Sequence, residues 1–164
     1  MVICEPGDSE LRKDSCQARR CVLGRQHQEY LYVESELKKA VMAAVKDGYT
    51  RFINGGAAGA DLLFAAVVAE LREQGCPISL EAALPYRSRL NSRDPAFQTM
   101  ISACDRIKVL CEESSRSCYY TRNRYMVDES DLVIAVYNGR DTGGTVYTTN
   151  YAQDKGKTVQ VISI

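Results

Sequence analysis

The sequence lacks the features that mark several common classes of protein. Its 21 basic and 21 acidic residues cancel, so the composition gives no sign of a nucleic-acid or membrane surface. It has one histidine and no C-x-x-C pair among seven cysteines, which excludes the usual ligand spacings of a zinc site. We therefore expect reduced thiols, no metal ion and a cytoplasmic protein.

Long apolar runs are also missing. No stretch approaches the roughly 20 residues of a membrane span, and the first residues lack the architecture of a signal peptide. We expect a soluble protein with no membrane partner. A chain of 164 residues has the length of one domain and can bury roughly two-thirds of its unfolded surface. The expected organisation is a single domain over residues 1–164.

From residue 30 onward, helix and strand patterns alternate. Helical spacing of apolar residues, with caps and breakers, predicts helices at 33–46, 61–74, 94–104, 117–129 and 145–155. Short apolar runs predict strands at 51–54, 78–84, 106–110, 131–137 and 158–162. This order is typical of a Rossmann-like three-layer α/β/α sandwich with a mainly parallel sheet.

The first thirty residues allow two positions for an opening strand. One is Met1–Cys4, and the other is Arg20–Leu23, which precedes Gly24. We favour the second.

The most informative feature is a glycine turn between a strand and a helix, Arg51-Phe-Ile-Asn-Gly-Gly-Ala-Ala-Gly-Ala-Asp61. Glycines let backbone N–H groups approach a ligand with no Cβ in the way. The helix N-terminus behind them favours an anion. The spacing matches neither G-x-G-x-x-G nor a P-loop, and a tight turn that only packs the helix is the alternative. The predicted ligand-binding residues here are Gly55, Gly56, Ala57 and Gly59.

A second turn follows the buried strand at 131–137 and contains Gly143, Gly144 and Thr145. The two glycines again expose backbone donors, and the threonine hydroxyl can cap the helix or meet a phosphate oxygen. In a parallel sheet, both turns lie at the carboxyl edge of the strands, where ligands bind. The two turns are therefore predicted to hold opposite sides of one ligand.

A third element is the helical segment that contains Arg122 and Asn123. Arg122 lies one turn before Met126, so an inward-facing Met126 would bring Arg122 close to the sheet edge. A guanidinium there can pair with a phosphate or a carboxylate. The alternative is a surface arginine paired with an acidic side chain.

Asp61 and Pro85 complete the predicted ligand site. Asp61 either caps the helix amides, which we favour slightly, or accepts a ribose hydroxyl. Pro85 ends a strand on the same edge and can contact a base or a sugar. No residue is assigned a catalytic or metal-binding role.

These motifs, in this order, resemble those of YpsA-like bacterial proteins. Such proteins belong to the SLOG superfamily, together with the LOG and Smf/DprA proteins. The resemblance rests on Ile53–Asp61, Ala83–Pro85, Arg122–Asp128 and Gly143–Thr145, and covers residues 36–164. It implies a Rossmann-like sheet and a site for a nucleotide or a nucleotide-derived ligand. Residues 1–30 match poorly, since only Gly24-Arg25 corresponds to the Gly-His-Arg-Pro turn of these proteins.

LOG hydrolases, to which the resemblance extends, pair an arginine with a glutamate just after their glycine loop. Arg122 falls where that arginine would be, but Val146–Asn150 contains no carboxylate. Cleavage of an N-glycosidic bond usually needs a carboxylate, so this departure disfavours an enzyme.

We therefore expect a binding protein with a sensor or sequestering role, for which NAD, ADP-ribose and AMP are candidate ligands. One alternative is a nucleotide N-glycosidase that uses Arg122 with Asp61 or Asp141. Another is DprA-like binding of single-stranded DNA, which the neutral charge disfavours. Whether the protein forms a homo-oligomer is left open.

Overall fold

The structure, a computed structural model, describes the backbone of residues 2–3, 16–139 and 141–164, and the side chains of residues 27–139 and 141–164. Its helices are α1 (Cys16–Lys46), α2 (Ala60–Glu73), the short 3-10 helix η1 (Arg87–Asn91), α3 (Pro95–Ala103), α4 (Arg116–Asp128) and α5 (Gly144–Asp154). Its strands are β1 (Val2–Ile3), β2 (Arg51–Asn54), β3 (Ser79–Leu84), β4 (Arg106–Val109), β5 (Leu132–Tyr137) and β6 (Thr158–Ser163).

Among the described residues, six strands form one parallel sheet in the order β4-β3-β2-β1-β5-β6. The chain builds the sheet outward from β1 to β4 and then returns to place β5 on the other side of β1. Ligands bind at such a reversal of strand order in open α/β sheets. The predicted Rossmann-like α/β fold is therefore confirmed.

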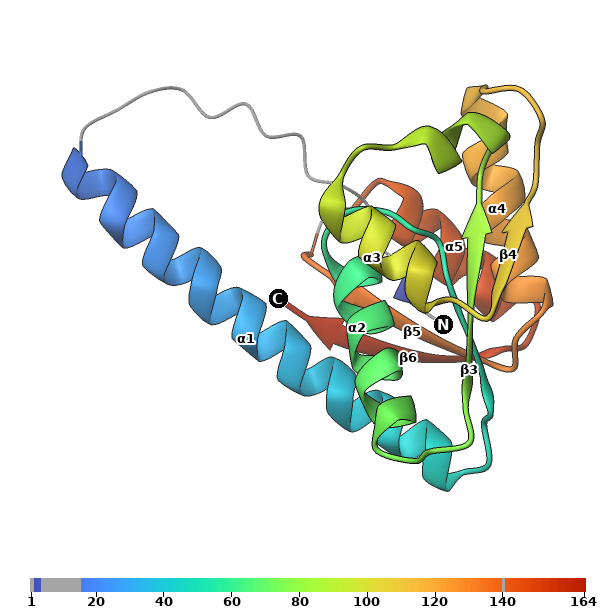
Figure 1. Cartoon of the computed structure of the whole chain (residues 1–164), viewed down its shortest axis with the longest axis horizontal. Coiled ribbons are helices and arrows are strands. Elements are labelled where there is room, and N and C mark those ends of the chain that lie inside the picture. The colour runs from blue at the N-terminus through green and yellow to red at the C-terminus, as the bar shows by residue number, and fades with distance from the viewer. Residues whose placement is uncertain (1, 4–15, 140) are drawn as a thin grey trace.

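The helices α1, α2 and α3 cover one face of the sheet. Each contributes fully buried side chains to a single apolar cluster, including Leu37 of α1, Phe64 of α2 and Phe97 of α3. The apolar residues of α2 occupy most of its surface, which explains why eight of its residues are buried. The N-terminal half of α1 extends away from the rest of the molecule (Figure 1). None of the helices in the described part of the chain combines the length and apolar character needed to cross a bilayer.

The helices α4 and α5 cover the other face. A second apolar cluster joins them to the sheet, and its buried members are Ile53, Ala83, Met126, Val127, Val133 and Ala152. Aromatic contacts link the two helices, because the rings of Tyr120 and Tyr147 lie 4.9 Å apart at a steep angle. Arg124 adds a hydrogen bond of 2.6 Å from its Nε to the Tyr147 hydroxyl.

A buried carboxylate ties β3 to its neighbours. Glu81 is 1% exposed, and its Oε1 accepts a hydrogen bond of 2.6 Å from the Tyr125 hydroxyl. Its Oε2 accepts one of 2.9 Å from Nη2 of Arg51 on β2. Burial, together with the hydrogen bond to Glu81, raises the pKa of Tyr125 to about 12. Such partners are what a buried carboxylate requires, so Glu81 connects β2, β3 and α4.

The N-terminal prediction was wrong. The first strand is Val2–Ile3, within the alternative that we did not favour, whereas Arg20–Leu23 lies inside α1. Met1 and Cys4 lie outside the described residues. A run of three apolar residues before a glycine does not separate a strand from a helix. In addition, the described side chains from His27 to Tyr32 are exposed, so these six residues show no buried stripe from which a helix could be predicted.

Candidate functional site

Both glycine turns lie at the carboxyl edge of the sheet, on either side of β1. The first follows β2 and leads into α2, and the second follows β5 and leads into α5. Since β2 and β5 are the two parallel neighbours of β1, the prediction that the turns share one edge is confirmed. The helices α2 and α5 both contact β1, from opposite faces of the sheet.

The strands at this edge end at unequal heights. Asn54, the last residue of β2, is level with Val2 of β1 and through it with Ile134 of β5. However, β5 continues for three more residues, to Tyr137, and β3 continues for two residues beyond the partner of Asn54, to Leu84. At roughly 3.3 Å per residue, the end of β2 therefore lies about 10 Å below the end of β5 along the strand direction.

The first turn is held by Arg122, which reaches it from α4. Its Nη1 donates a hydrogen bond of 2.6 Å to the Gly55 carbonyl and lies 3.9 Å from Oδ2 of Asp61 on α2. Both charged side chains are buried, at 7% and 1% exposure. A Cβ on Gly55 would lie 1.8 Å from that Nη1, so only glycine allows this approach. The expectation that Met126 packs inward and brings Arg122 to the sheet edge is confirmed.

Two amides of the first turn are bonded within the protein. The N–H of Gly56 donates to Oδ1 of Asn54 at 2.9 Å, and the N–H of Ala57 donates to Oδ2 of Asp61 at 3.0 Å. Asp61 thus binds an amide of the turn before α2, which differs from the favoured prediction that it caps the amides of the helix itself. Among the described residues of this turn, Ala58 and Gly59 are exposed just before α2 and can offer their amides to a ligand, whereas Ala60 at the start of the helix is buried.

The second turn presents a helix N-terminus with no side-chain cap. Gly143 precedes α5 with φ of 129° and ψ of 179°, a conformation that essentially only glycine adopts, and as a glycine it has no side chain to cap the helix. Gly144 is partly exposed, whereas Thr145 is buried. The N–H groups of the first helical turn have no acceptor within the helix, so they can donate to a ligand.

Two further predicted ligand-binding residues, Asn123 and Pro85, are both buried. Asn123, on α4 next to Arg122, is 5% exposed, and its Oδ1 has no hydrogen-bond partner among the described residues. Pro85 follows β3, and its carbonyl accepts a hydrogen bond of 3.1 Å from the N–H of Cys111. Its ring is covered, so a contact with a base or sugar would need an opening of this segment.

Sequence reasoning missed Arg89 in the short helix η1. Its Nη2 donates to the Gly56 carbonyl at 3.3 Å, and its guanidinium lies 4.5 Å from the centre of the Phe97 ring. Tyr86 and Tyr119 also meet here, with hydroxyls 3.3 Å apart. That hydrogen bond and burial raise the pKa of Tyr119. No local pattern marks Arg89, because its partners are Gly56 in the turn between β2 and α2 and Phe97 on α3.

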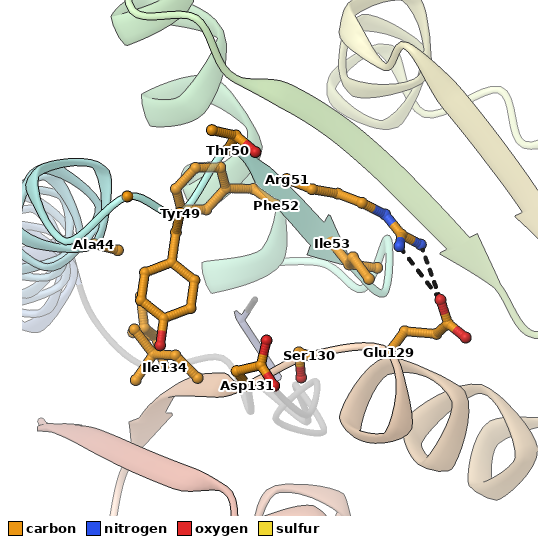
Figure 2. Close-up of a pocket in the computed structure, with 12 residues that line it drawn as sticks. Ala44, Tyr49, Thr50, Arg51, Phe52, Ile53, Glu129, Ser130, Asp131 and Ile134 are labelled. Atoms are coloured by element: carbon orange, nitrogen blue, oxygen red, sulfur yellow. Dashed lines mark hydrogen bonds and ion pairs between the residues drawn. The ribbon is translucent and has the colours of Figure 1, made fainter.

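A separate cavity lies at the opposite, amino edge of the sheet (Figure 2). Because β1 begins level with Asn54 and Ile134, no described strand separates the start of β2 from the start of β5. The cavity has a volume of about 270 Å³, and Figure 2 shows Arg51 pointing toward Glu129, with which it forms an ion pair of 3.3 Å. None of the predicted ligand-binding residues lines this cavity.

The acidic and thiol side chains of the described part of the chain form no cluster of three that could hold a metal. The two carboxylates considered for catalysis differ in setting. Asp61 is buried against Ala57 and Arg122, and Asp141 is exposed in the second turn.

Comparison with known proteins agrees with this architecture. A family model described as the YspA SLOG family matches residues 18–163, which includes most of α1. The Uncharacterized SPbeta prophage-derived protein YoqJ of Bacillus subtilis (strain 168) is 28% identical over 141 residues, which cover 72% of this chain and 81% of YoqJ. A UPF0398 protein of Bacillus pumilus (strain SAFR-032) is 23% identical over 129 residues, which cover 75% of this chain and 69% of that protein. A UPF0398 protein of Bacillus thuringiensis (strain Al Hakam) is 22% identical over 131 residues, with 76% and 71% covered. The chain belongs to the YspA SLOG family.

Proposed function

We propose that this protein binds a nucleotide or a nucleotide-derived ligand at the carboxyl edge of its sheet. One observation carries the proposal: α2 and α5 begin on either side of β1, each after a glycine with positive φ and without a side-chain cap. Each helix N-terminus has a partial charge of about +0.5 and unpaired N–H groups, which together favour an anion.

The spacing of the two turns supports a ligand longer than one phosphate. β2 and β5 are separated by β1, so the turns lie about 10 Å apart across the sheet, at roughly 4.8 Å per strand. A ligand with its phosphate at one turn would need its base or its far end to reach the other, which a whole nucleotide such as NAD, ADP-ribose or AMP can do.

Arg122 serves this site mainly by shaping the first turn. Its hydrogen bond to the Gly55 carbonyl and its position beside Asp61 hold the loop that leads into α2. Its positive charge then adds to the potential of the helix N-terminus. We propose that ligand binding serves a sensor or sequestering role, since no described carboxylate lies exposed beside Arg122 to assist a hydrolytic reaction.

Isothermal titration of the folded protein with NAD, ADP-ribose, AMP and cyclic AMP tests this proposal. We expect heat from at least one of the four, with one ligand bound per chain. Absence of heat from all four would contradict nucleotide binding. Incubation with AMP, followed by chromatography, checks the enzymatic alternative, because release of free adenine would indicate N-glycosidase activity.

A further inference from the structure

A second guanidinium lies at the first glycine turn. Arg89 and Arg122 donate to the carbonyls of consecutive residues, Gly56 and Gly55. They approach from opposite faces of the sheet, because Arg89 packs on Phe97 of α3 whereas Arg122 belongs to α4. The guanidinium carbon of Arg122 also lies 6.0 Å from the centre of the Tyr119 ring. Both positive charges are therefore held at the same glycine turn.

The two arginines differ in how their charges are balanced. Arg122 is buried and has Asp61 beside it. Arg89 is partly exposed and forms no ion pair within the described part of the chain, where its one hydrogen bond goes to a neutral carbonyl. A guanidinium has five N–H donors, so most of those on Arg89 are available to a ligand. The aromatic face of Phe97 restricts its orientation before any ligand arrives.

Charge balance indicates which phosphate would suit this position. Arg89 contributes +1, and the N-terminus of α2 contributes about +0.5. A phosphomonoester has a charge of about −1.5 to −2 at pH 7, whereas a phosphodiester has −1. The local charge therefore matches a phosphomonoester better.

We propose that Arg89 binds the phosphate of the ligand and makes the site selective for a terminal phosphomonoester over a phosphodiester. This inference rests on the proposed function and names the ligand class for the same site. Arg89 binds the anion directly, while Arg122 positions the turn beneath it.

Isothermal titration with AMP and with 3′,5′-cyclic AMP separates the two phosphate classes, since these nucleotides differ in that group. The variants are Arg89→Gln, Arg89→Lys and, as a matched control, Arg87→Gln. Arg87 lies in the same short helix but is exposed and paired with Glu112. Inorganic pyrophosphate serves as a third probe without a base or sugar. Thermal unfolding checks that each variant is folded.

We expect the wild type to bind AMP about tenfold or more tightly than cyclic AMP. Loss of one charge-assisted hydrogen bond in Arg89→Gln should weaken AMP binding by about tenfold to a hundredfold and bring the two affinities close together. Arg89→Lys should keep part of the preference, and Arg87→Gln should keep all of it. Equal weakening of both nucleotides, or an unchanged preference, would overturn the inference.

The outcomes also separate this inference from the proposed function. Nucleotide binding that Arg89→Gln leaves unchanged would support the function and refute the role of Arg89. Pyrophosphate binding that Arg89→Gln abolishes, without binding of any nucleotide, would support the anion site and refute the nucleotide function. Absence of binding by all three probes would refute this inference, and the proposed function would be refuted as well if NAD and ADP-ribose also failed to bind.

Discussion

The substitution Gly55→Ala tests how closely Arg122 is fitted to the first glycine turn. The new Cβ would lie 1.8 Å from Nη1 and 2.7 Å from Cζ of Arg122, and 2.9 Å from Oδ2 of Asp61. Gly55 is not among the glycines with positive φ, so alanine fits the backbone conformation. Most of the cost should therefore arise from displacing the Arg122 guanidinium, with a smaller part from the contact with the Asp61 carboxylate.

The expected loss in the free energy of unfolding is about 3 kcal/mol. A hydrogen bond from a charged donor contributes about 1.5–3 kcal/mol, and the bond of 2.6 Å to the Gly55 carbonyl must break. Forcing extra atoms into a packed site costs about 1–3 kcal/mol. Asp61 keeps its bond from Ala57, which limits the penalty for a buried carboxylate.

Urea unfolding of a double-mutant cycle with Arg122→Ala measures this effect. Without the arginine side chain, Gly55→Ala should cost at most about 1 kcal/mol, which gives a coupling energy of about 2 kcal/mol. Gly75→Ala is the control, because Gly75 has φ of 97° and open space around its Cβ position. It should cost about 1–2 kcal/mol in either background. An equal cost of Gly55→Ala with and without Arg122 would refute the reasoning.

Three further predictions concern other parts of the molecule. Gly143→Ala should strain the entry to α5 and weaken AMP binding in a calorimetric titration, whereas Gly156→Ala, at the far end of α5, should leave the affinity unchanged despite its own positive φ. Glu81→Gln should lower the free energy of unfolding in urea by about 1–3 kcal/mol, because Arg51 and Tyr125 then no longer donate to a charged carboxylate. An unchanged urea midpoint of unfolding would contradict this. Since the pKa of Tyr125 is raised to about 12, its contribution to stability is complete below about pH 10 and is lost as the pH rises toward 12. Tyr125→Phe should show a flatter stability profile between those pH values, and parallel profiles would argue against the bond to Glu81.

Most of the fold could be predicted from local patterns. The strand at 132–137 and the helix at 60–73 are strongly apolar and bounded by polar or glycine residues, so their type and position were clear. The start of α1 could not be predicted, because its described N-terminal side chains are exposed and give no periodic signal. The two-residue strand β1 is shorter than any pattern can define. Its place in the sheet is determined by its neighbours β2 and β5.

Residues of the site could be predicted only where their role follows from their position along the chain, after a strand or on one face of a helix. The glycine turns after two strands identified the carboxyl edge of the sheet as the expected site. The spacing of one helical turn between Arg122 and Met126 indicated that Arg122 is buried. The internal use of the Gly56 amide by Asn54 was missed, because an asparagine at a strand end has many possible partners. Arg89 was missed because the carbonyl that it binds, that of Gly56, comes from a distant segment, and the ring that it packs on belongs to another helix. Contacts of this kind depend on tertiary packing, which a single sequence does not encode in its spacing.

Amide chemical shifts during a titration with AMP give the most direct test of a ligand site between the two turns. The account predicts that the largest shift changes fall at residues 58–61 and 143–146, on both sides of β1. Changes confined to the opposite edge, near Tyr49 and Asp131, would contradict it, as would changes at only one of the two turns.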